Sequence, residues 1–160
     1  MYELVSTLVV IYIIVTGVTT FIIRFKRRER KRIKGLTLTK LKSMSPREFE
    51  HTMAELLNRL GYKDVKVIGG AGDLAVDIIA KYGKDTRVAV QCKRYTSKKV
   101  GSPELQMFIG MMITEYKASK GIYITTSSFT KDAIELASRH RIELWDSNKL
   151  VDILTGIEQD

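Results

Sequence analysis

The stretch from Gly69 to Lys93 constrains the fold of this chain more than any other part of its sequence. It contains a glycine-rich turn, an apolar run, a short polar turn and a second apolar run. Two such runs joined by a short turn are typical of a β-hairpin. Side chains two apart on a strand point the same way, so Gln91 and Lys93 share a face and Cys92 points away. Pairing of the two strands would bring Asp77, at the start of the first strand, close to Gln91 and Lys93.

An acid, an amide and an amine at one place suit the binding of a hard cation beside a phosphate and an attacking water. Asp77 would be the anionic ligand, Gln91 offers a neutral carbonyl oxygen, and Glu50 on an earlier helix is the candidate for a second carboxylate. Lys93 would hold or polarise the water, or stabilise a developing oxyanion. Asp73 is expected to pin the glycine turn through backbone N–H groups. On its own this spacing also fits a turn acid followed by an edge-strand lysine.

Residues 4–23 form an uncharged, almost entirely aliphatic run that is about long enough to span a bilayer. A cleaved signal peptide and a buried core helix are the alternatives. A signal peptide has a basic start and a shorter apolar run, whereas this chain begins Met1-Tyr2-Glu3 and its positive charge follows the run. We therefore expect a retained transmembrane helix that contacts the lipid bilayer.

The basic charge of the chain is concentrated directly after this run. Residues 24–34 hold eight Lys or Arg and one Glu (+7), Glu3 adds −1, and residues 35–160 hold 19 basic and 16 acidic residues (+3), which together give the net charge of +9. The positive-inside rule places the N-terminus outside and the rest of the chain in the cytoplasm. The basic segment is thus a topology signal, with nucleic-acid contact as the alternative. The lone cysteine excludes an internal disulfide and fits a reducing compartment.

The rest of the chain reads as one α/β domain. Residues 35–44 are expected to be a linker between the N-terminal segment (1–34) and the domain (45–160). Ser45 and Glu48 form a capping box at the start of the first helix, and Gly61 ends it. Strands are expected at 62–68, 76–82, 86–94, 121–125 and 142–145, with helices from 102, at 130–140 and from 147 to 154. This order predicts a mixed central sheet flanked by helices.

Several short sequence motifs accompany the acid–amide–amine pattern in a fixed order. They are Phe49-Glu50, Leu60-Gly61-Tyr62, Gly69 to Asp73, Asp77, Val90 to Tyr95, Val100-Gly101, Gly121-Ile122, Ile124-Thr125-Thr126, Phe129-Thr130 and Ala133. Together they resemble the Mrr-like restriction endonuclease catalytic domain, a branch of the PD-(D/E)xK nuclease superfamily with a Gln-x-Lys variant. The resemblance covers roughly residues 44–154.

The resemblance implies a metal-dependent DNA endonuclease with a restriction-endonuclease-like αβββαβ core, using Mg²⁺ or Mn²⁺. It places the catalytic aspartate on Asp77, the Gln-x-Lys pair on Gln91 and Lys93, the helical acid on Glu50 and the Gly-Asp turn on Gly72-Asp73. The expected metal ligands are Asp77, Gln91 and Glu50. Restriction of foreign DNA is one implied role, and cutting of branched DNA, as in junction resolvases, is another.

This chain departs from the family pattern in two ways. It has Ala75 where a glycine is usual, and it has the apolar N-terminal run in place of the helix-turn-helix-like domain that many members use for DNA recognition. Arg94, Lys98 and Lys99 follow the Gln-x-Lys pair and could contact DNA phosphates, with a solvated loop as the alternative. Cutting both strands needs two active sites, which favours a homodimer. The alternative function is a non-catalytic, membrane-tethered module that binds nucleic acid or protein.

Overall fold

The fold was obtained as a computed structural model. It describes residues 2–33, 35–69 and 75–159, and the side chains of 2–6, 8, 9, 25–33, 158 and 159 also lie outside the description. The chain divides into two compact units, Met1–Gly35 and Leu36–Asp160. We describe each unit by itself.

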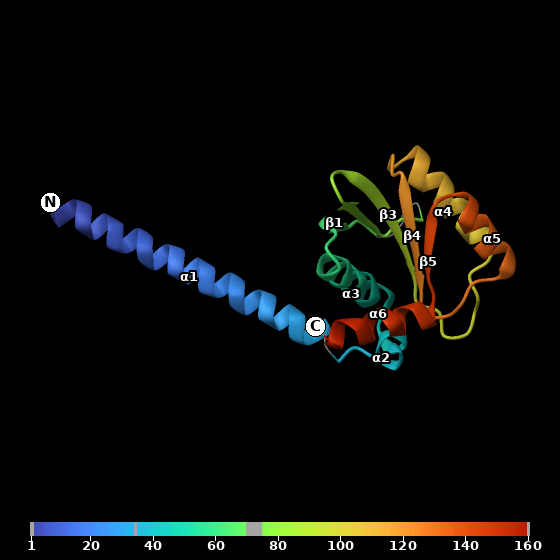
Figure 1. Cartoon of the computed structure of the whole chain (residues 1–160), viewed down its shortest axis with the longest axis horizontal. Coiled ribbons are helices and arrows are strands. Elements are labelled where there is room, and N and C mark those ends of the chain that lie inside the picture. Colours follow the sequence, from blue (N-terminus) through green and yellow to red (C-terminus); the bar gives the residue numbers. More distant parts are fainter. Residues whose placement is uncertain (1, 34, 70–74, 160) are drawn as a thin grey trace. The chain divides into compact units, whose positions relative to one another are not determined.

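The first unit consists of helix α1 (Tyr2–Ile33), drawn in blue in Figure 1. Its described apolar side chains are solvent-exposed, and Tyr12 and Phe21 are each 70% exposed. Within the described residues, no helix combines the length and the apolar character needed to cross a membrane. The predicted anchor at 4–23 includes residues whose side chains lie outside the description, and it stays a prediction.

The second unit is built around a five-stranded sheet with the order β1-β2-β3-β4-β5. The strands are β1 (Lys63–Val67), β2 (Ile78–Tyr82), β3 (Thr86–Lys93), β4 (Lys120–Thr125) and β5 (Ile142–Trp145). Strands β1, β2 and β3 pair antiparallel, whereas β3, β4 and β5 pair parallel. The predicted mixed sheet is therefore confirmed. Parallel neighbours need a crossover connection, and a helix lies in each of the two connections.

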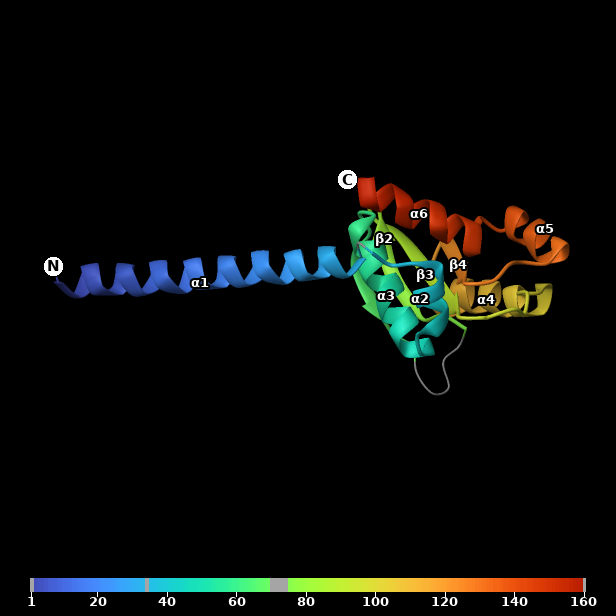
Figure 2. The same cartoon turned by 90° about the horizontal axis from the view of Figure 1, so that it is seen from below.

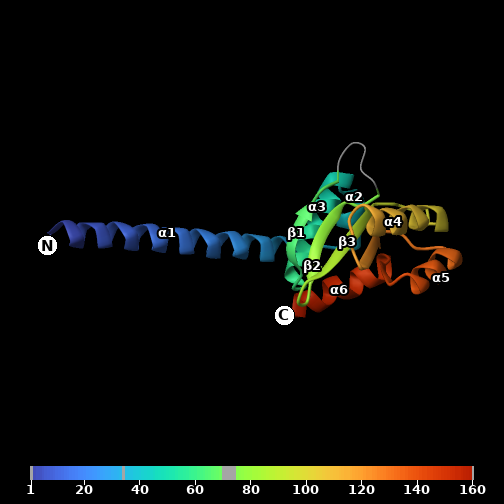
Figure 3. The same ribbon diagram turned by 90° about the horizontal axis from the view of Figure 1, so that it is seen from above.

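Helices cover both faces of this sheet, as Figures 1 to 3 show. They are α2 (Leu38–Ser43), α3 (Pro46–Arg59), α4 (Ser102–Thr114), α5 (Lys131–Arg139) and α6 (Ser147–Gln159). Helix α3 begins at the predicted capping box: Ser45 Oγ accepts from the Glu48 N–H, and Glu48 Oε2 accepts from the Ser45 N–H. Helix α3 packs on β1 and β3, and α4 and α5 pack against the other face.

The segment predicted as a linker, residues 35–44, differs from that expectation because helix α2 lies within it. The hydroxyl of Thr37 caps this helix by accepting a hydrogen bond of 3.2 Å from the Lys40 N–H. Leu36 and Leu41 are buried, at 4% and 0% exposure. From Leu36 on, the segment belongs to the second compact unit.

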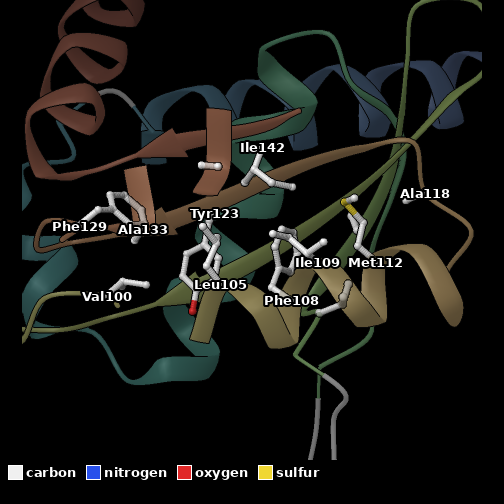
Figure 4. Close-up of a cluster of buried hydrophobic side chains, with 13 residues drawn as sticks. Val100, Leu105, Phe108, Ile109, Met112, Ala118, Tyr123, Phe129, Ala133 and Ile142 are labelled. Carbon is white, nitrogen blue, oxygen red and sulfur yellow. The ribbon is translucent and has the colours of Figure 1, made fainter. Parts of the chain in front are cut away.

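The core on the α4 and α5 side is shown in Figure 4. The ring of Tyr123 packs edge-to-face against Phe108 and Phe129, with ring centroids 5.4 and 5.8 Å away. Gly121 lies close to Phe108 and Ile142, so that a Cβ at this position would approach both within 3 Å. The core therefore fixes how α4 and α5 lie against β4 and β5. It also helps to hold in place the strand ends that carry the candidate site.

Candidate active site

The β2–β3 register ends at the pair Ile78 and Val90, so Asp77 and Gln91 are the next residue along each strand, and the Asp77 N–H donates to the Val90 carbonyl over 2.8 Å. The Gln91 side chain donates from Nε2 to Asp77 Oδ2 over 2.7 Å, and the Cys92 N–H donates to the same oxygen over 2.6 Å. Asp77 and Gln91 are 2% and 1% exposed. The acid and the amide that the sequence singled out are thus joined in one buried pair at the end of the sheet.

The other polar atom of the Gln91 amide, Oε1, is buried and accepts no hydrogen bond from the residues that the structure describes. Its orientation follows from chemistry, because Nε2 must face the acceptor oxygen of Asp77 and Oε1 therefore points elsewhere. A buried acceptor of this kind needs an explanation. A carbonyl oxygen beside a carboxylate is a suitable ligand pair for a hard cation.

The donor set therefore fits the divalent cation that the sequence predicts. Across residues 2–33, 35–69 and 75–159 there is no group of three or more His, Cys, Asp or Glu side chains that could hold a metal ion. The predicted set of Asp77, Gln91 and Glu50 has two carboxylates and one amide, which is a different kind of group. Bound Mg²⁺ keeps several waters and needs few protein ligands.

The two remaining predicted residues, Glu50 and Lys93, both act electrostatically on the buried thiol of Cys92. Glu50 is half-buried on α3, and Lys93 is half-buried at the end of β3. The pKa of Cys92 lies well above its ordinary value, first because of burial and then because of the charges of Asp77 and Glu50, while Lys93 acts in the opposite direction. The structure thus places all three charged residues within electrostatic reach of one point. Cys92 itself is buried, as its alternation along the strand predicts.

The backbone of Lys93 is held by hydroxyl groups that sequence reasoning missed. Thr125 Oγ1 donates to the Lys93 carbonyl over 2.8 Å, and Thr126 Oγ1 donates to the Tyr95 carbonyl over 2.7 Å. Both threonine side chains are fully buried. The available signal was the Thr125-Thr126 pair at the end of the predicted strand 121–125, because polar residues that end a parallel strand lie beside the end of the neighbouring strand.

Two of the three basic residues predicted to contact DNA make contacts within the chain. Arg94 Nη1 donates to a carbonyl of α2 over 2.9 Å, and Lys98 Nζ lies 3.1 Å from Glu104 Oε1 and 5.0 Å from the centre of the Tyr95 ring. Lys99 is exposed. Arg94 therefore ties the strand end to α2, and DNA contact stays a prediction for all three residues.

Glu104, in the first turn of α4, was not singled out from the sequence, yet it holds the loop after Lys93. Its Oε1 accepts from the Tyr95 hydroxyl over 2.7 Å, and its Oε2 accepts from the Gly101 N–H over 2.9 Å. Burial alone would raise the pKa of Glu104, but the hydrogen bonds from Gly101, Tyr95 and Lys98 outweigh it and lower the pKa. Burial and the bond to Glu104 raise the pKa of Tyr95.

The glycine turn before Asp77 is only partly described. The predicted turn residues Gly72 and Asp73 lie outside the described residues. Ala75, where the family pattern has glycine, is described and has a φ angle of 58°. This is the left-handed region, which costs a residue with a Cβ about 1–2 kcal/mol. The departure from the family pattern therefore falls at a position whose backbone conformation favours glycine.

A hollow of about 500 Å³ lies at the opposite end of the sheet, where β3, β4 and β5 begin. Its lining residues are Thr86, Ser119, Lys120, Arg141, Ile142 and Glu143. None of the predicted catalytic side chains belongs to this lining, so the hollow is separate from the acid–amide pair.

A mixed five-stranded sheet whose central hairpin presents a buried acid–amide pair places the second unit among the restriction-endonuclease-like α/β domains. Comparison of the sequence with protein families agrees: residues 41–154 match the restriction endonuclease family Mrr_cat. The chain belongs to this family.

Relatives in sequence and in structure point the same way. The chain is 38% identical over 124 residues to the type IV methyl-directed restriction enzyme EcoKMrr of Escherichia coli strain K12, a match that covers 73% of this chain and 40% of that enzyme. The DNA modification-dependent restriction endonuclease AspBHI matches with a TM-score of 0.60 at 18% identity, covering 81% of this chain and 35% of that one. The protein of unknown function AF1548 matches with a TM-score of 0.57 at 16% identity, covering 69% and 65%. These two structures support the fold.

Proposed function

We propose that this chain is a Mg²⁺-dependent DNA endonuclease that hydrolyses phosphodiester bonds, with Mn²⁺ as an alternative metal. The observation that carries the proposal is the buried Gln91 Oε1, which lacks a hydrogen-bond donor among the described residues while its amide partner Nε2 holds Asp77. Membership of the restriction endonuclease family supports the same chemistry.

In this proposal each residue of the site has a separate task. Asp77, Gln91 and Glu50 hold the cation, which when bound neutralises charge on the phosphate and makes a water more acidic. The Cys92 N–H and the Gln91 amide fix one oxygen of Asp77, so the carboxylate keeps its orientation. Lys93, on the same face of β3 as Gln91, orients the attacking water or stabilises the oxyanion. Gly72 and Asp73 lie outside the described residues, and support of the turn stays their predicted role.

The proposed substrate is DNA, and restriction of foreign DNA is the proposed role. The name of the Escherichia coli relative, a type IV methyl-directed restriction enzyme, supports it, although the chain spans only about 40% of that enzyme's length. Cutting of branched DNA, as by a junction resolvase, is the neighbouring alternative. A homodimer would supply the two active sites that a double-strand cut needs.

We further propose that residues 4–23 anchor the chain in the cell membrane, with the N-terminus outside and the catalytic domain in the cytoplasm. The exposed apolar side chains of α1 support this. So do its threonines: Thr16 Oγ1 donates to the Tyr12 carbonyl and Thr20 Oγ1 to the Thr16 carbonyl, over 2.8 and 2.7 Å. Hydroxyls that bond to their own helix need no water, which suits an apolar surrounding.

The nuclease proposal is tested with the full-length chain purified in detergent and incubated with plasmid and with branched DNA. The reaction is run with Mg²⁺, with Mn²⁺ and with EDTA, for the parent chain and for Asp77→Asn and Lys93→Ala. Asparagine at position 77 keeps an acceptor for the Cys92 N–H, so this variant is expected to fold. We expect metal-dependent cutting by the parent and a loss of at least about 100-fold in each variant.

Two exposed residues provide matched controls: Asp85→Asn and Lys84→Ala, in the turn between β2 and β3, change the same charges at the opposite end of the hairpin from Asp77 and Gln91. They are expected to cut DNA like the parent. DNA binding without cutting by any of the chains, in any metal, would instead identify a non-catalytic binding module.

The membrane proposal is tested separately by washing cell membranes with alkaline carbonate. The parent chain is expected to stay with the membranes, and a double variant with Val15→Lys and Val18→Lys is expected to be released, because charge in the bilayer interior is costly. Release of the parent chain by carbonate contradicts the anchor. Protease added to the outside of intact cells should leave the C-terminal domain uncut if that domain is cytoplasmic.

A further inference from the structure

The backbone pairing between β3 and β4 weakens at Lys93. The last backbone bond there, from the Thr126 N–H to the Lys93 carbonyl, is 3.4 Å long, whereas such bonds are usually about 2.9–3.0 Å. The same carbonyl accepts a shorter bond of 2.8 Å from the Thr125 hydroxyl. A side chain thus supplies the stronger contact where the regular ladder ends.

The Thr125 hydroxyl both donates and accepts a hydrogen bond. It donates to the Lys93 carbonyl and accepts from the Ser127 N–H over 3.2 Å. The residue is 0% exposed, so water cannot take over either bond. Thr125 also pairs with Lys93 in the parallel register, and it therefore lies beside the residue whose backbone it holds.

Thr126 and Glu104 hold the next part of the chain. The Thr126 hydroxyl donates to the Tyr95 carbonyl, and the Tyr95 N–H donates in turn to the Lys93 carbonyl over 3.0 Å. At the other end of the same residue, the Tyr95 hydroxyl donates to Glu104 Oε1. Lys93 is thus followed by a loop that is fastened to both β4 and α4.

We propose that Thr125 and Thr126 are positioning residues that fix the backbone at Lys93 and thereby the place of its ammonium group. This inference rests on the proposed role of Lys93 in the nuclease reaction. A long lysine side chain can reach many positions, so a fixed carbonyl shortens the range over which the ammonium can move. Two buried hydroxyls at the end of a strand cost stability unless they are bonded, and here both bond to the backbone around Lys93.

The test replaces each hydroxyl by a methyl of similar shape, in Thr125→Val and Thr126→Val, in the full-length chain. Single-turnover cleavage, DNA affinity without metal and amide hydrogen exchange at Tyr95 and Ser127 are measured for each. We expect cleavage to slow about 10- to 100-fold while DNA affinity stays within about twofold, because a displaced catalytic group lowers the rate of chemistry rather than binding. Thr125→Ser keeps the hydroxyl and is expected to recover most of the rate.

Thr130→Val is the matched control. The Thr130 hydroxyl also bonds to backbone, accepting from the Ala133 N–H over 3.2 Å at the start of α5, but it does not contact the backbone around Lys93. The same chemical change at this position should lower thermal stability by a similar amount and leave the cleavage rate close to that of the parent.

The outcomes separate this proposal from the proposed function. If Thr125→Val and Thr126→Val cut DNA at the parent rate, or lose no more than Thr130→Val, the positioning role is overturned and the nuclease proposal stands. If the parent cuts no DNA, the nuclease proposal fails. Hydrogen exchange then tests by itself whether the threonine hydroxyls fix the backbone at Lys93. Faster exchange of the Tyr95 amide in Thr125→Val supports this role, and unchanged exchange overturns it.

Discussion

The two ends of the sheet differ in where their polar side chains lie: they are buried at one end and exposed at the other. At the end where β3 and β4 finish, Asp77, Gln91, Thr125 and Thr126 are buried, and they make up four of the five buried polar or charged side chains in the described part of the chain. At the end where these strands begin, charges meet at the surface: Lys81 lies 2.9 Å from Asp64 and Lys120 lies 3.2 Å from Glu143.

The two kinds of polar group differ in what they cost the folded protein. Exposed ion pairs contribute little to stability. Buried polar groups are costly unless each one is bonded, and one of those at the first end, Gln91 Oε1, has no such bond within the described residues. A cost of this kind is expected where a cation or substrate completes the bonding. This supports the proposed function at the first end, which we call the working end of the sheet.

The largest effect should come from replacing the amide at the working end by a second acid. In Gln91→Glu, a carboxylate would stand about as close to Asp77 as the amide now does, at 2.7 Å. Two buried carboxylates repel or must share a proton, so we expect the free energy of unfolding to fall by about 3 kcal/mol without metal. Mg²⁺ should restore more stability to this variant than to the parent, as measured by thermal unfolding with and without the ion.

The matched control is Gln106→Glu, which makes the same change on the exposed face of α4. It should leave both the unfolding midpoint and its response to Mg²⁺ unchanged. A Gln91→Glu chain that is as stable as the parent in EDTA, or that gains nothing from Mg²⁺, speaks against a cation site beside Asp77.

The second effect tests whether stability at the end of the sheet where β4 begins depends on close packing of apolar side chains. In Gly121→Ala, the new Cβ would lie 2.6 Å from Ile142 Cδ1 and 2.8 Å from both Met112 Sδ and Phe108 Cε1. Overfilling a packed core of this kind costs about 1–3 kcal/mol. Gly110→Ala on α4 meets no atom within 4 Å and should instead stabilise by about 1 kcal/mol, because alanine favours the helix. Denaturant unfolding of both variants should therefore give changes of opposite sign.

Much of this contrast could be predicted from the sequence, because it follows from local rules. The short turn after Tyr82 fixes the hairpin register, and that register places Asp77 and Gln91 directly beyond its last pair, Ile78 and Val90. The capping box at Ser45 and the alternation that buries Cys92 are equally local. For the same reason, the order of helices and strands in the domain was correctly predicted.

What the sequence could not supply were contacts between distant segments. The bonds from Thr125 to Lys93 and from Glu104 to Tyr95 depend on β4 and α4 lying against β3, which no local pattern specifies. The helix within residues 35–44 was missed because its burial of Leu41 depends on tertiary packing. Propensity alone gives little stability to so short a helix.

The third effect concerns pH and the carboxylate that fastens the loop after Lys93. The folded state lowers the pKa of Glu104 below its ordinary value of 4.5. The stability that Glu104 contributes is therefore fully present above about pH 4.5 and is lost as the pH falls through its folded pKa. We expect Glu104→Gln to be less stable than the parent by about 1 kcal/mol at neutral pH. Their unfolding midpoints, measured as a function of pH, should converge in acid; curves that stay parallel below pH 4 would contradict the role of this carboxylate.

The smallest effect lies in the turn that leads into Asp77, and it tests whether the working end also stores backbone strain. Ala75 has a φ of 58°, a conformation that glycine adopts without steric cost. Ala75→Gly relieves that cost, of about 1–2 kcal/mol, but adds freedom to the unfolded chain worth about 0.4–1 kcal/mol, so the net gain should be about 0.5 kcal/mol.

Lys117 provides the comparison, because it has a φ of 49° in a turn between α4 and β4, away from the acid–amide pair. Lys117→Gly should raise the unfolding midpoint by a similar amount and leave DNA cleavage unchanged. If Ala75→Gly gains the same stability but slows cleavage, the alanine contributes to function by restricting the turn before Asp77; if cleavage is unchanged as well, the strain is incidental, and the difference between the two ends of the sheet lies in their buried polar groups alone.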